Sequence, residues 1–374
     1  MRLKTLIISG FRNLKPLKLN FSDEKNLNVF IGANGQGKTN LLEAIYLLAF
    51  SKSFRTSENQ DLIGFSEDFC SVEGEFSAKT KESPEGANRD SRLQVIVTKN
   101  PPEKGLKING VSSRSVDFIG HLKAVFFNPD DLEMIHGAPR LRRRYLDLLL
   151  LQLNHRYLVD LMDYNALIKQ RNALLRQIKA GESSANHLSV WDEKCVPLGY
   201  SIVKRRLEAL SQIKKKVHQF YTQISQTKEA IDVEYRFSTT DFPANEQKFA
   251  RMMQDSRSRD IEMRATTIGP HRDDLLFLLD KKPFRNFGSR GQWRSLVLAL
   301  KFTEIELLQE QSKTEPLLLL DDVFSELDES HQRHLFEAAV GIQTLVTTTH
   351  DSFLDLIKDE KSVFKVQNGA ITIQ

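Results

Sequence analysis

An octapeptide near the N-terminus has the residue types and spacing of a phosphate-binding loop. It reads Gly32-Ala33-Asn34-Gly35-Gln36-Gly37-Lys38-Thr39 and fits the pattern Gly, four residues, Gly-Lys-Thr. Glycines let backbone N–H groups curl round a phosphate, Lys38 would reach the outer phosphates, and the Thr39 hydroxyl would hold Mg²⁺. An ordinary glycine-rich turn requires neither Lys-Thr nor a following helix. The octapeptide therefore predicts binding of ATP with Mg²⁺, and Lys38 is also expected to act in catalysis.

Two adjacent carboxylates would form the second half of such a site. The apolar run Leu317–Leu320 ends in Asp321-Asp322, and ligands of open α/β sheets gather at the carboxyl ends of buried parallel strands. Asp321 would hold Mg²⁺ through water, and Asp322 would orient or deprotonate the attacking water. The alternative is a pair of acids that cap a turn. That reading is weaker, because an unpartnered carboxylate at the rim of a buried sheet costs stability.

A third motif, Ser289-Arg290-Gly291-Gln292, opens a stretch with helical periodicity that runs to Leu308. It resembles the Ser-Gly-Gly-Gln signature of the ATP-binding-cassette class and lies about 30 residues before Asp321, as in that class. Taken alone, Ser-x-Gly-Gln could be a helix cap. The resemblance implies that Ser289, Gly291 and Gln292 bind the γ-phosphate of ATP held by a second subunit.

Further segments follow the cassette order, with two departures. Ser325–Asp328 resembles the dimer-contact loop of that class, and His350 resembles its switch histidine, which implies a catalytic role as a γ-phosphate sensor. Asp322 stands where most cassettes have the longer Glu, which suggests slow hydrolysis. The stretch Phe126–Pro129 contains no Gln, so that Asn128 is the nearest candidate for the role of the usual glutamine.

The elements that must position these residues alternate between strand and helix, as in an α/β fold. We expect strands within residues 2–31, a helix at 38–50, and a polar loop at Lys81–Asp90. Helices follow from about residue 130, with breaks at Gly181, Pro197 and Gly199. The later elements are a helix from Gly291 to Leu308 and one at about 331–340. The remaining expected strands are Cys70–Phe76, Leu93–Thr98, Gly105–Ile108, Ala124–Phe127, Ile231–Phe237, Leu275–Leu279, Leu317–Leu320 and Gln343–Thr348.

This order predicts an α/β core of residues 1–128 and 265–374 interrupted by a helical insertion of residues 129–264. No run approaches the roughly 18 apolar residues of a membrane span, and the N-terminus does not resemble a signal peptide. We therefore expect a cytoplasmic protein with no membrane partner. Cys70 and Cys195 lack the spacing of a disulfide framework or a zinc site.

Positive charge is concentrated in the helical insertion. Between Arg140 and Lys216 there are 16 Lys/Arg against seven Asp/Glu. The clusters Arg142–Arg144, Lys204–Arg206 and Lys214–Lys216 favour binding of nucleic-acid phosphates, because adjacent cations repel one another unless an anion is near. Two alternatives stay open: charge-rich helices are often solvated faces, and Arg142–Arg144 could pair with acids in the bundle. No base-reading element is evident, so that recognition of DNA backbone and junction shape is expected.

Longer stretches resemble the RecF family of bacterial DNA replication and repair ATPases, whose fold is similar to the Rad50 head without its coiled coil. The last of these stretches is the most specific, since transporters and the longer structural-maintenance ATPases lack it. They are Phe11-Arg12-Asn13, Asn40-Leu41-Leu42-Glu43-Ala44, Ser53-Phe54-Arg55-Thr56, Pro129-Asp130-Asp131-Leu132, Arg142–Asp147 and Thr267-Ile268-Gly269-Pro270-His271-Arg272-Asp273-Asp274.

The resemblance implies an ABC-type P-loop ATPase head with an inserted helical domain. It also implies an ATP-dependent homodimer on double-stranded, single-stranded and gapped DNA, weak DNA-stimulated hydrolysis that releases the dimer, and work with RecR and RecO in loading RecA. One alternative is the nucleotide-binding subunit of an ABC transporter, against which the basic insertion and Gly269–Asp274 argue. Another is an ATP-binding switch without hydrolysis, which Asp322 keeps open.

Overall fold

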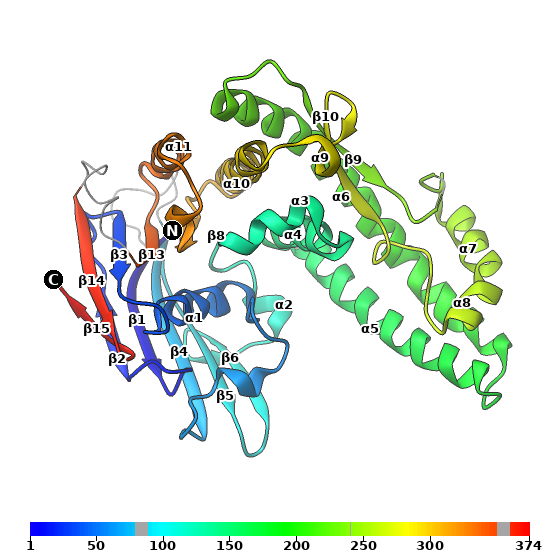
Figure 1. The fold of residues 1–374 in the computed structure, drawn as a ribbon. Helices are drawn as coiled ribbons and strands as arrows, with labels where there is room; N and C mark the ends of the chain where they lie inside the picture. The colour runs from blue at the N-terminus through cyan, green and yellow to red at the C-terminus, as the bar shows by residue number, and fades with distance from the viewer. Residues whose placement is uncertain (79–88, 240, 350–359) are drawn as a thin grey trace. The chain divides into compact units, whose positions relative to one another are not determined.

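The computed structural model describes residues 1–78, 89–239, 241–349 and 360–374. The chain forms two compact units, one made of Met1–Asp131 with Leu300–Gln374 and the other of Leu132–Ala299 (Figure 1). The expected loop at Lys81–Asp90 falls largely outside the described residues. Within the described ranges, no helix combines the length and the apolar content that crossing a bilayer demands.

A mostly parallel six-stranded sheet forms the centre of the first unit (Figure 1). One central strand contains the four leucines Leu317–Leu320, each of which is at most 1% exposed. Burial of both faces of the sheet explains why this strand is apolar throughout. Among the described strands of this sheet, only the edge strand Ala370–Ile373 runs antiparallel to its neighbour. In spatial order the strands are β15 (Ala370–Ile373), β14 (Lys361–Gln367), β3 (Leu27–Ile31), β13 (Thr344–Thr348), β12 (Leu317–Asp321) and β8 (Ala124–Phe127).

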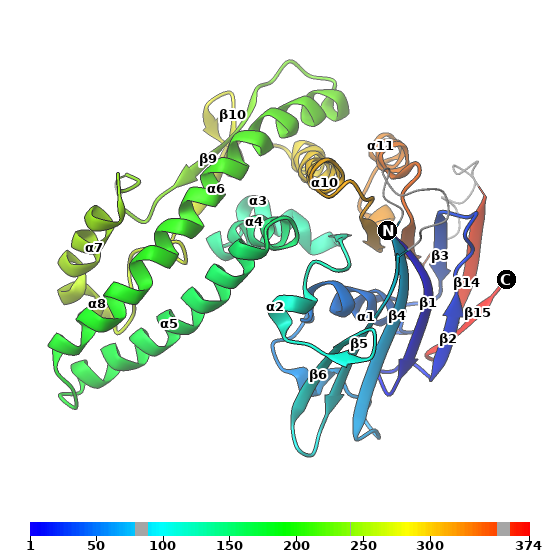
Figure 2. The same ribbon diagram turned by 180° about the vertical axis from the view of Figure 1, so that it is seen from behind.

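A second, antiparallel sheet belongs to the same unit (Figure 2). Its middle strands alternate buried and partly buried side chains, as expected for a sheet with one face in the core. Its strands are, in spatial order, β2 (Leu17–Asn20), β1 (Arg2–Ser9), β4 (Phe69–Ala78), β5 (Arg89–Thr98), β6 (Glu103–Ile108) and β7 (Val111–Ser112).

Helix α1 (Lys38–Phe50) contacts strands of both sheets, including β4 and β12. Every residue from Leu41 to Phe50 is buried, because the helix is apolar around almost its whole circumference. The unit also contains α2 (Ser115–Phe118), α11 (Glu329–Ala339) and the later part of α10 (Arg290–Ser312). The packing of α1 holds its first residue, Lys38, at a fixed place beside the sheet.

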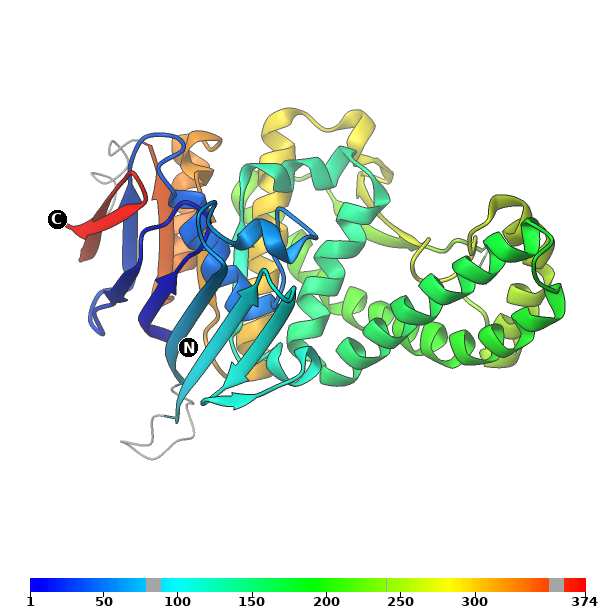
Figure 3. The ribbon, with the colours of Figure 1, turned by 90° about the horizontal axis from the view of Figure 1, so that it is seen from below.

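The second unit is mainly helical, and its longest helices α5 and α6 run side by side (Figure 3). It includes a three-stranded antiparallel sheet in the order β11, β10, β9. Its helices are α3 (Glu133–His136), α4 (Pro139–Leu153), α5 (His155–Lys179), α6 (Leu188–Ser225), α7 (Glu246–Asp255), α8 (Arg257–Met263), α9 (Phe284–Phe287) and the start of α10, and its strands are β9 (Ile231–Arg236), β10 (Asp274–Leu279) and β11 (Lys282–Pro283).

Two expectations about this unit need correction. Pro197 and Gly199 do not break the helix, since α6 runs through both. Gly199 packs tightly instead, because a Cβ there would lie 2.8 Å from the ring of Phe249. The unit also extends to Ala299 rather than to residue 264. The reason is that β10 pairs with β9 along its whole length, which ties the chain after residue 265 to the helical unit.

Candidate nucleotide-binding site

The glycine-rich loop joins the end of β3 to the start of α1, as its pattern predicts. Gly35 and Gly37 have φ values of 77° and 111°, a backbone region that favours glycine. Gly32 is required for space, since a Cβ there would lie 2.3 Å from the carbonyl oxygen of Val366. Among the described residues no side chain caps the N-terminus of α1. Its first N–H groups can therefore bind an anion.

Lys38 folds back over the loop that precedes it. Its Nζ donates hydrogen bonds to the carbonyl oxygens of Gly32 at 2.6 Å and Ala33 at 2.9 Å. Burial lowers its pKa below the ordinary value for lysine, while the carboxylates of Asp322 and Asp321 oppose that shift. A phosphate inside the loop would add negative charge near this ammonium group and favour its protonated form.

Thr39 and Asp321 lie together, although 282 residues separate them. The Thr39 hydroxyl donates to Asp321 Oδ1 at 2.9 Å, and the Thr347 hydroxyl donates to the same oxygen at 2.6 Å. Burial raises the pKa of Asp321, and the hydrogen bonds from Thr347 and Thr39 oppose that rise. A hydroxyl and a carboxylate are hard oxygen ligands of the kind that Mg²⁺ takes beside nucleotide phosphates, so the residues present fit that ion.

Asp322 has a left-handed backbone conformation, with φ of 50°. Its N–H donates to both the carbonyl oxygen and the hydroxyl of Thr347, each at 3.1 Å. Such conformations cost energy in residues other than glycine and occur often at functional sites. The two adjacent acids thus have different surroundings, since Asp321 accepts hydrogen bonds from two threonines while the backbone turns at Asp322.

A cavity of about 440 Å³ opens above these groups, within the usual volume range of ligand sites. Asn128 lies on its wall, as proposed for the missing glutamine, and its N–H donates to Asp131 Oδ2 at 3.0 Å. Arg55 also lines the cavity, and its guanidinium donates to the side-chain oxygen of Asn40 at 2.7 Å. Sequence reasoning gave no function to Arg55, although Arg55 stood in one of the stretches that resemble the RecF family.

A buried ion pair supports the wall of this cavity. Glu43 on α1 is 0% exposed and accepts two hydrogen bonds from the guanidinium of Arg12, at 3.0 and 2.8 Å. Ser53 also donates to Glu43, and Arg55 lies 3.8 Å from it. Since a buried carboxylate without partners would be costly, these three residues explain how a glutamate can occupy an apolar helix.

Two further segments with predicted functions follow β12, namely Ser325–Asp328 and the segment that contains His350. Asp328 caps α11, because its side chain accepts hydrogen bonds from the N–H groups of Ser330 and His331, both at 3.1 Å. The function of Ser325–Asp328 as a dimer contact stays a prediction. His350 lies outside the described residues, so its expected function as a switch histidine also stays a prediction.

The signature segment lies in the second unit, at the start of α10. Ser289 and Gly291 are exposed, whereas Gln292 is partly buried. The Ser289 Oγ accepts a hydrogen bond from the N–H of Gln292 at 3.2 Å, which is the helix-cap geometry weighed as an alternative. A cap and a phosphate contact are compatible, because a capped helix end still presents backbone N–H groups.

Several cations of the basic segment turn inward. Arg142 is 4% exposed and pairs with both carboxylate oxygens of Asp274, at 2.8 and 3.0 Å. Arg206 is 2% exposed and pairs with Asp147 at 2.7 Å. The alternative that arginines pair with acids in the bundle is therefore confirmed for Arg142. The cations that stay exposed are Arg140, Arg144, Arg156, Lys169, Arg176, Lys179, Lys194, Lys204 and Lys215.

The stretch Thr267–Asp274 holds these arginines in place. Arg206 donates to the carbonyl oxygen of Pro270 at 2.7 Å, and His271 Nδ1 lies 2.9 Å from the hydroxyl of Tyr164. Burial lowers the pKa of His271 to about 4. The stretch that most specifically resembles the RecF family therefore contributes to the polar core of the helical unit.

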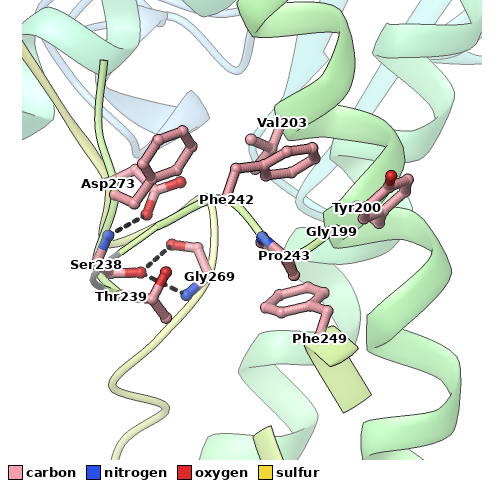
Figure 4. A pocket seen from close by; sticks show the side chains of 11 residues that line it. Gly199, Tyr200, Val203, Ser238, Thr239, Phe242, Pro243, Phe249, Gly269 and Asp273 are labelled. Atoms are coloured by element: carbon pink, nitrogen blue, oxygen red, sulfur yellow. Dashed lines mark hydrogen bonds between the residues drawn. The ribbon is translucent and has the colours of Figure 1, made fainter. Parts of the chain in front are cut away.

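A small cavity lies beside this stretch in the same unit (Figure 4). The N–H of Ser238 donates to Asp273 Oδ1 at 2.7 Å, and the N–H of Gly269 donates to the Ser238 hydroxyl oxygen at 2.8 Å. Phe242 and Phe249 close the apolar side. With a volume of about 10 Å³, the space has room for roughly one water and for no larger ligand.

Comparisons with known proteins identify the family of the chain. The family model described as the RecF/RecN/SMC N terminal domain matches residues 2–372. The chain is 36% identical over 373 residues to the DNA replication and repair protein RecF of Lachnoclostridium phytofermentans, a match that covers 99% of each chain.

Solved structures extend the likeness to the fold. A structure described as the recombination mediator protein RecF-ATP in the RecFOR pathway superposes with a TM-score of 0.88 at 32% identity, covering 100% of this chain and 97% of the other. An Smc head bound to the C-winged helix domain of ScpA gives a TM-score of 0.57 at 16% identity, covering 100% and 97%, which shows a shared fold alone. The resemblance and the fold class expected from the motifs are confirmed: the chain belongs to the RecF family and has an ABC-type ATPase head fold.

Proposed function

We propose that the protein is an ATP-dependent DNA-binding protein of recombinational repair, which dimerises on ATP at gapped or single-strand/double-strand junction DNA. The observation that carries the nucleotide part is the placement of Thr39 Oγ1 2.9 Å from Asp321 Oδ1 beside a cavity of about 440 Å³. A phosphate loop, two acids and a cavity of this volume together suit a nucleoside triphosphate with its metal ion.

Each group in the site has a separate task in this proposal. The loop N–H groups and Lys38 bind the β- and γ-phosphates, which requires Lys38 to leave the carbonyl oxygens of Gly32 and Ala33. Thr39 and Asp321 hold Mg²⁺, which neutralises phosphate charge when it is bound. Asp322 orients the attacking water. Arg55 adds a further cation at the cavity wall.

The dimer completes the site. Ser289, Gly291 and Gln292 of one protomer bind the γ-phosphate of the ATP on the other, and His350 senses the same phosphate. ATP favours the closed dimer to the extent that it binds that state more tightly, and hydrolysis releases it. The dimer-contact function of Ser325–Asp328 belongs to the same proposal.

DNA binding is supported by the relatives and by the exposed cations. A relative is described as a DNA replication and repair protein, and another as a recombination mediator in the RecFOR pathway. The RecFOR description supports RecR and RecO as partners. Loading of RecA as the outcome is part of the proposal. The cations of α5 and α6 that stay exposed, among them Lys169, Lys204 and Lys215, are available for phosphates.

Phosphate release measured with and without gapped DNA tests the enzymatic part. We expect slow hydrolysis that DNA stimulates and that Asp322→Asn abolishes while ATP binding persists. Equal release by Asp322→Asn and the unaltered protein would remove Asp322 from the mechanism. Release that is absent under all conditions, with RecR and RecO included, would favour the ATP-binding switch without hydrolysis. Membership of the RecF family argues against the transporter alternative.

A further inference from the structure

The signature segment is closed by a reciprocal pair of hydrogen bonds. The Ser289 Oγ accepts from the N–H of Gln292 at 3.2 Å, and the Gln292 Oε1 accepts from the N–H of Ser289 at 2.7 Å. This is a capping box, in which the first and fourth residues satisfy one another at the start of a helix. The oxygen of the Gln292 side chain is therefore engaged inside its own segment.

The other end of the Gln292 amide is held by Glu229, which lies 63 residues earlier between α6 and β9. The Gln292 Nε2 donates to both carboxylate oxygens of Glu229, each at 2.9 Å. Glu229 in turn accepts from the Thr227 hydroxyl at 3.2 Å and from the Tyr221 hydroxyl at 3.4 Å. Tyr221 belongs to α6 and is 0% exposed, so the carboxylate is anchored to a rigid part of the second unit.

Both ends of the Gln292 side chain thus have partners within one compact unit. A phosphate that approached the Gln292 amide would compete with the carboxylate of Glu229 for it. The groups left to face a phosphate are the Ser289 hydroxyl hydrogen and the N–H groups of Arg290 and Gly291, which have no intrahelical acceptor in the first turn. Arg290 and Gly291 are both exposed.

We propose that Glu229 is a positioning residue for the signature segment: by fixing the Gln292 amide, it holds the Ser289 hydroxyl and the first-turn N–H groups in the orientation that receives the γ-phosphate of the opposite protomer. The inference rests on the proposed ATP-dependent dimer. It changes the function of Gln292 from a nucleotide ligand to a link between Glu229 and Ser289.

The carboxylate of Glu229 could also weaken the dimer through electrostatic repulsion. A negative charge near a bound γ-phosphate repels it, and removing Glu229 would then strengthen the dimer. The geometry favours positioning, because the two charge-assisted bonds to Gln292 orient the amide, whereas repulsion at an exposed helix end is screened by water and salt. The two effects predict opposite signs, so that an experiment can separate them.

The test measures ATP-dependent dimerisation of the full chain by sedimentation equilibrium with saturating ATP and Mg²⁺. Glu229→Ala should weaken the dimer by on the order of tenfold, because an ordered charge-assisted pair is lost. Glu229→Gln keeps one acceptor oxygen for the Gln292 amide and should stay within about twofold of the unaltered protein, because a hydrogen bond that orients the amide is retained. The matched control is Glu234→Ala, which removes an exposed carboxylate on β9.

Two further measurements, on Gln292→Leu variants and on ATP binding to the monomer, separate positioning by Glu229 from other effects. Gln292→Leu should weaken the dimer as Glu229→Ala does, and adding Glu229→Ala to it should cause no further loss. ATP binding to the monomer should be unchanged in all these variants, since the phosphate loop belongs to the other unit. Tighter dimers with both Glu229 variants, or affinities equal to the control, would overturn the positioning function. Absence of an ATP-dependent dimer in the unaltered protein would instead overturn the proposed function itself.

Discussion

Buried charged side chains have different surroundings in the nucleotide cavity and in the helical unit. Lys38 and Asp321 are 6% and 7% exposed, yet both face a cavity of about 440 Å³ in which a ligand could meet them. Arg171 and Arg206 are even more deeply buried, but their guanidinium groups point at acids and hydroxyls of their own unit. Burial of a charge therefore indicates a ligand site only where the chain leaves room beside it.

The difference matters for stability. Arg171 pairs with Asp192 at 2.8 Å and Asp260 at 2.7 Å, and Thr266 accepts another of its hydrogen bonds at 2.8 Å. Removal of one member of such a network leaves a buried charge uncompensated. Substitutions in the cavity should mainly change ligand binding, whereas those in the helical network should mainly change folding.

The largest effect is expected at Arg206. Arg206→Leu leaves Asp147 without its buried guanidinium partner and should lower the free energy of unfolding by roughly 3–5 kcal/mol. Denaturant unfolding measures it, and the control is Lys204→Leu, an exposed cation of the same cluster that should change stability by less than about 0.5 kcal/mol. Equal effects of the two substitutions would show that the inward orientation of Arg206 does not contribute to the free energy of unfolding.

Lys38→Met is the corresponding substitution in the nucleotide cavity, where it should change ligand binding more than stability. In the proposed site Lys38 would donate several charge-assisted hydrogen bonds to phosphate, so its loss should weaken ATP binding by on the order of 100-fold or more. Stability should hardly change, because the hydrogen bonds that Lys38 makes within the described part of the chain go to two carbonyl oxygens of its own loop. Titration with a fluorescent ATP analogue gives the affinity, and unfolding in denaturant gives the control. A Lys38→Met protein that binds ATP and shows ATP-stimulated DNA binding would count against the nucleotide site.

His271 gives the helical unit a pH dependence. Its pKa falls to about 4 in the folded protein, so that the unfolded chain binds more protons between pH 4 and pH 6.5. The stability that depends on neutral His271 is present above pH 6.5 and is lost as the pH falls toward 4. Between pH 7 and pH 5.5 the loss should be roughly 1 kcal/mol.

The variant His271→Gln provides the comparison, since glutamine has no proton to gain in this range. Unfolding at the two pH values should show a smaller fall in stability for the variant than for the unaltered protein. Parallel falls in both proteins would mean that other groups cause the pH dependence.

The smallest effect is expected from single exposed cations. Lys204→Glu and Lys215→Glu should each weaken DNA binding several-fold and lower the slope of log affinity against log salt by about 1, because one phosphate contact is lost. ATP binding should not change. Unchanged DNA affinity in both variants would show these faces to be merely solvated.

The site in the first unit could be predicted because its signals are local. The helix at 38–50 appears with the expected bounds, and the strand before Asp321 is as buried as its leucines imply. By contrast, the inward residue of Arg142–Arg144 could not be found from the triplet alone. Successive helical positions point in different directions, and the choice depends on Asp274, 132 residues later.

Other features depended on side-chain contacts that no motif of the phosphate site specifies. Arg55 belongs to a stretch that resembles the RecF family, but its place at the cavity depends on its contacts with Asn40 and Glu43. Glu229 is identified by its bonds to Gln292, 63 residues later. The sequence patterns did not predict β14 and β15, because Lys361–Gln367 alternates polar and apolar residues instead of forming an apolar run. Local pattern therefore predicts the phosphate loop well, but it cannot tell a buried arginine from a DNA-binding one.

The most direct test of the account is fluorescence anisotropy of a labelled gapped duplex, titrated with the protein at fixed moderate salt without nucleotide, with ADP and with ATP. We expect DNA affinity to rise with ATP alone, because ATP favours the closed dimer that brings two sets of exposed cations to one DNA molecule. Equal affinity under all three conditions would contradict the coupling of the nucleotide cavity to DNA, and absence of binding throughout would contradict the proposed function.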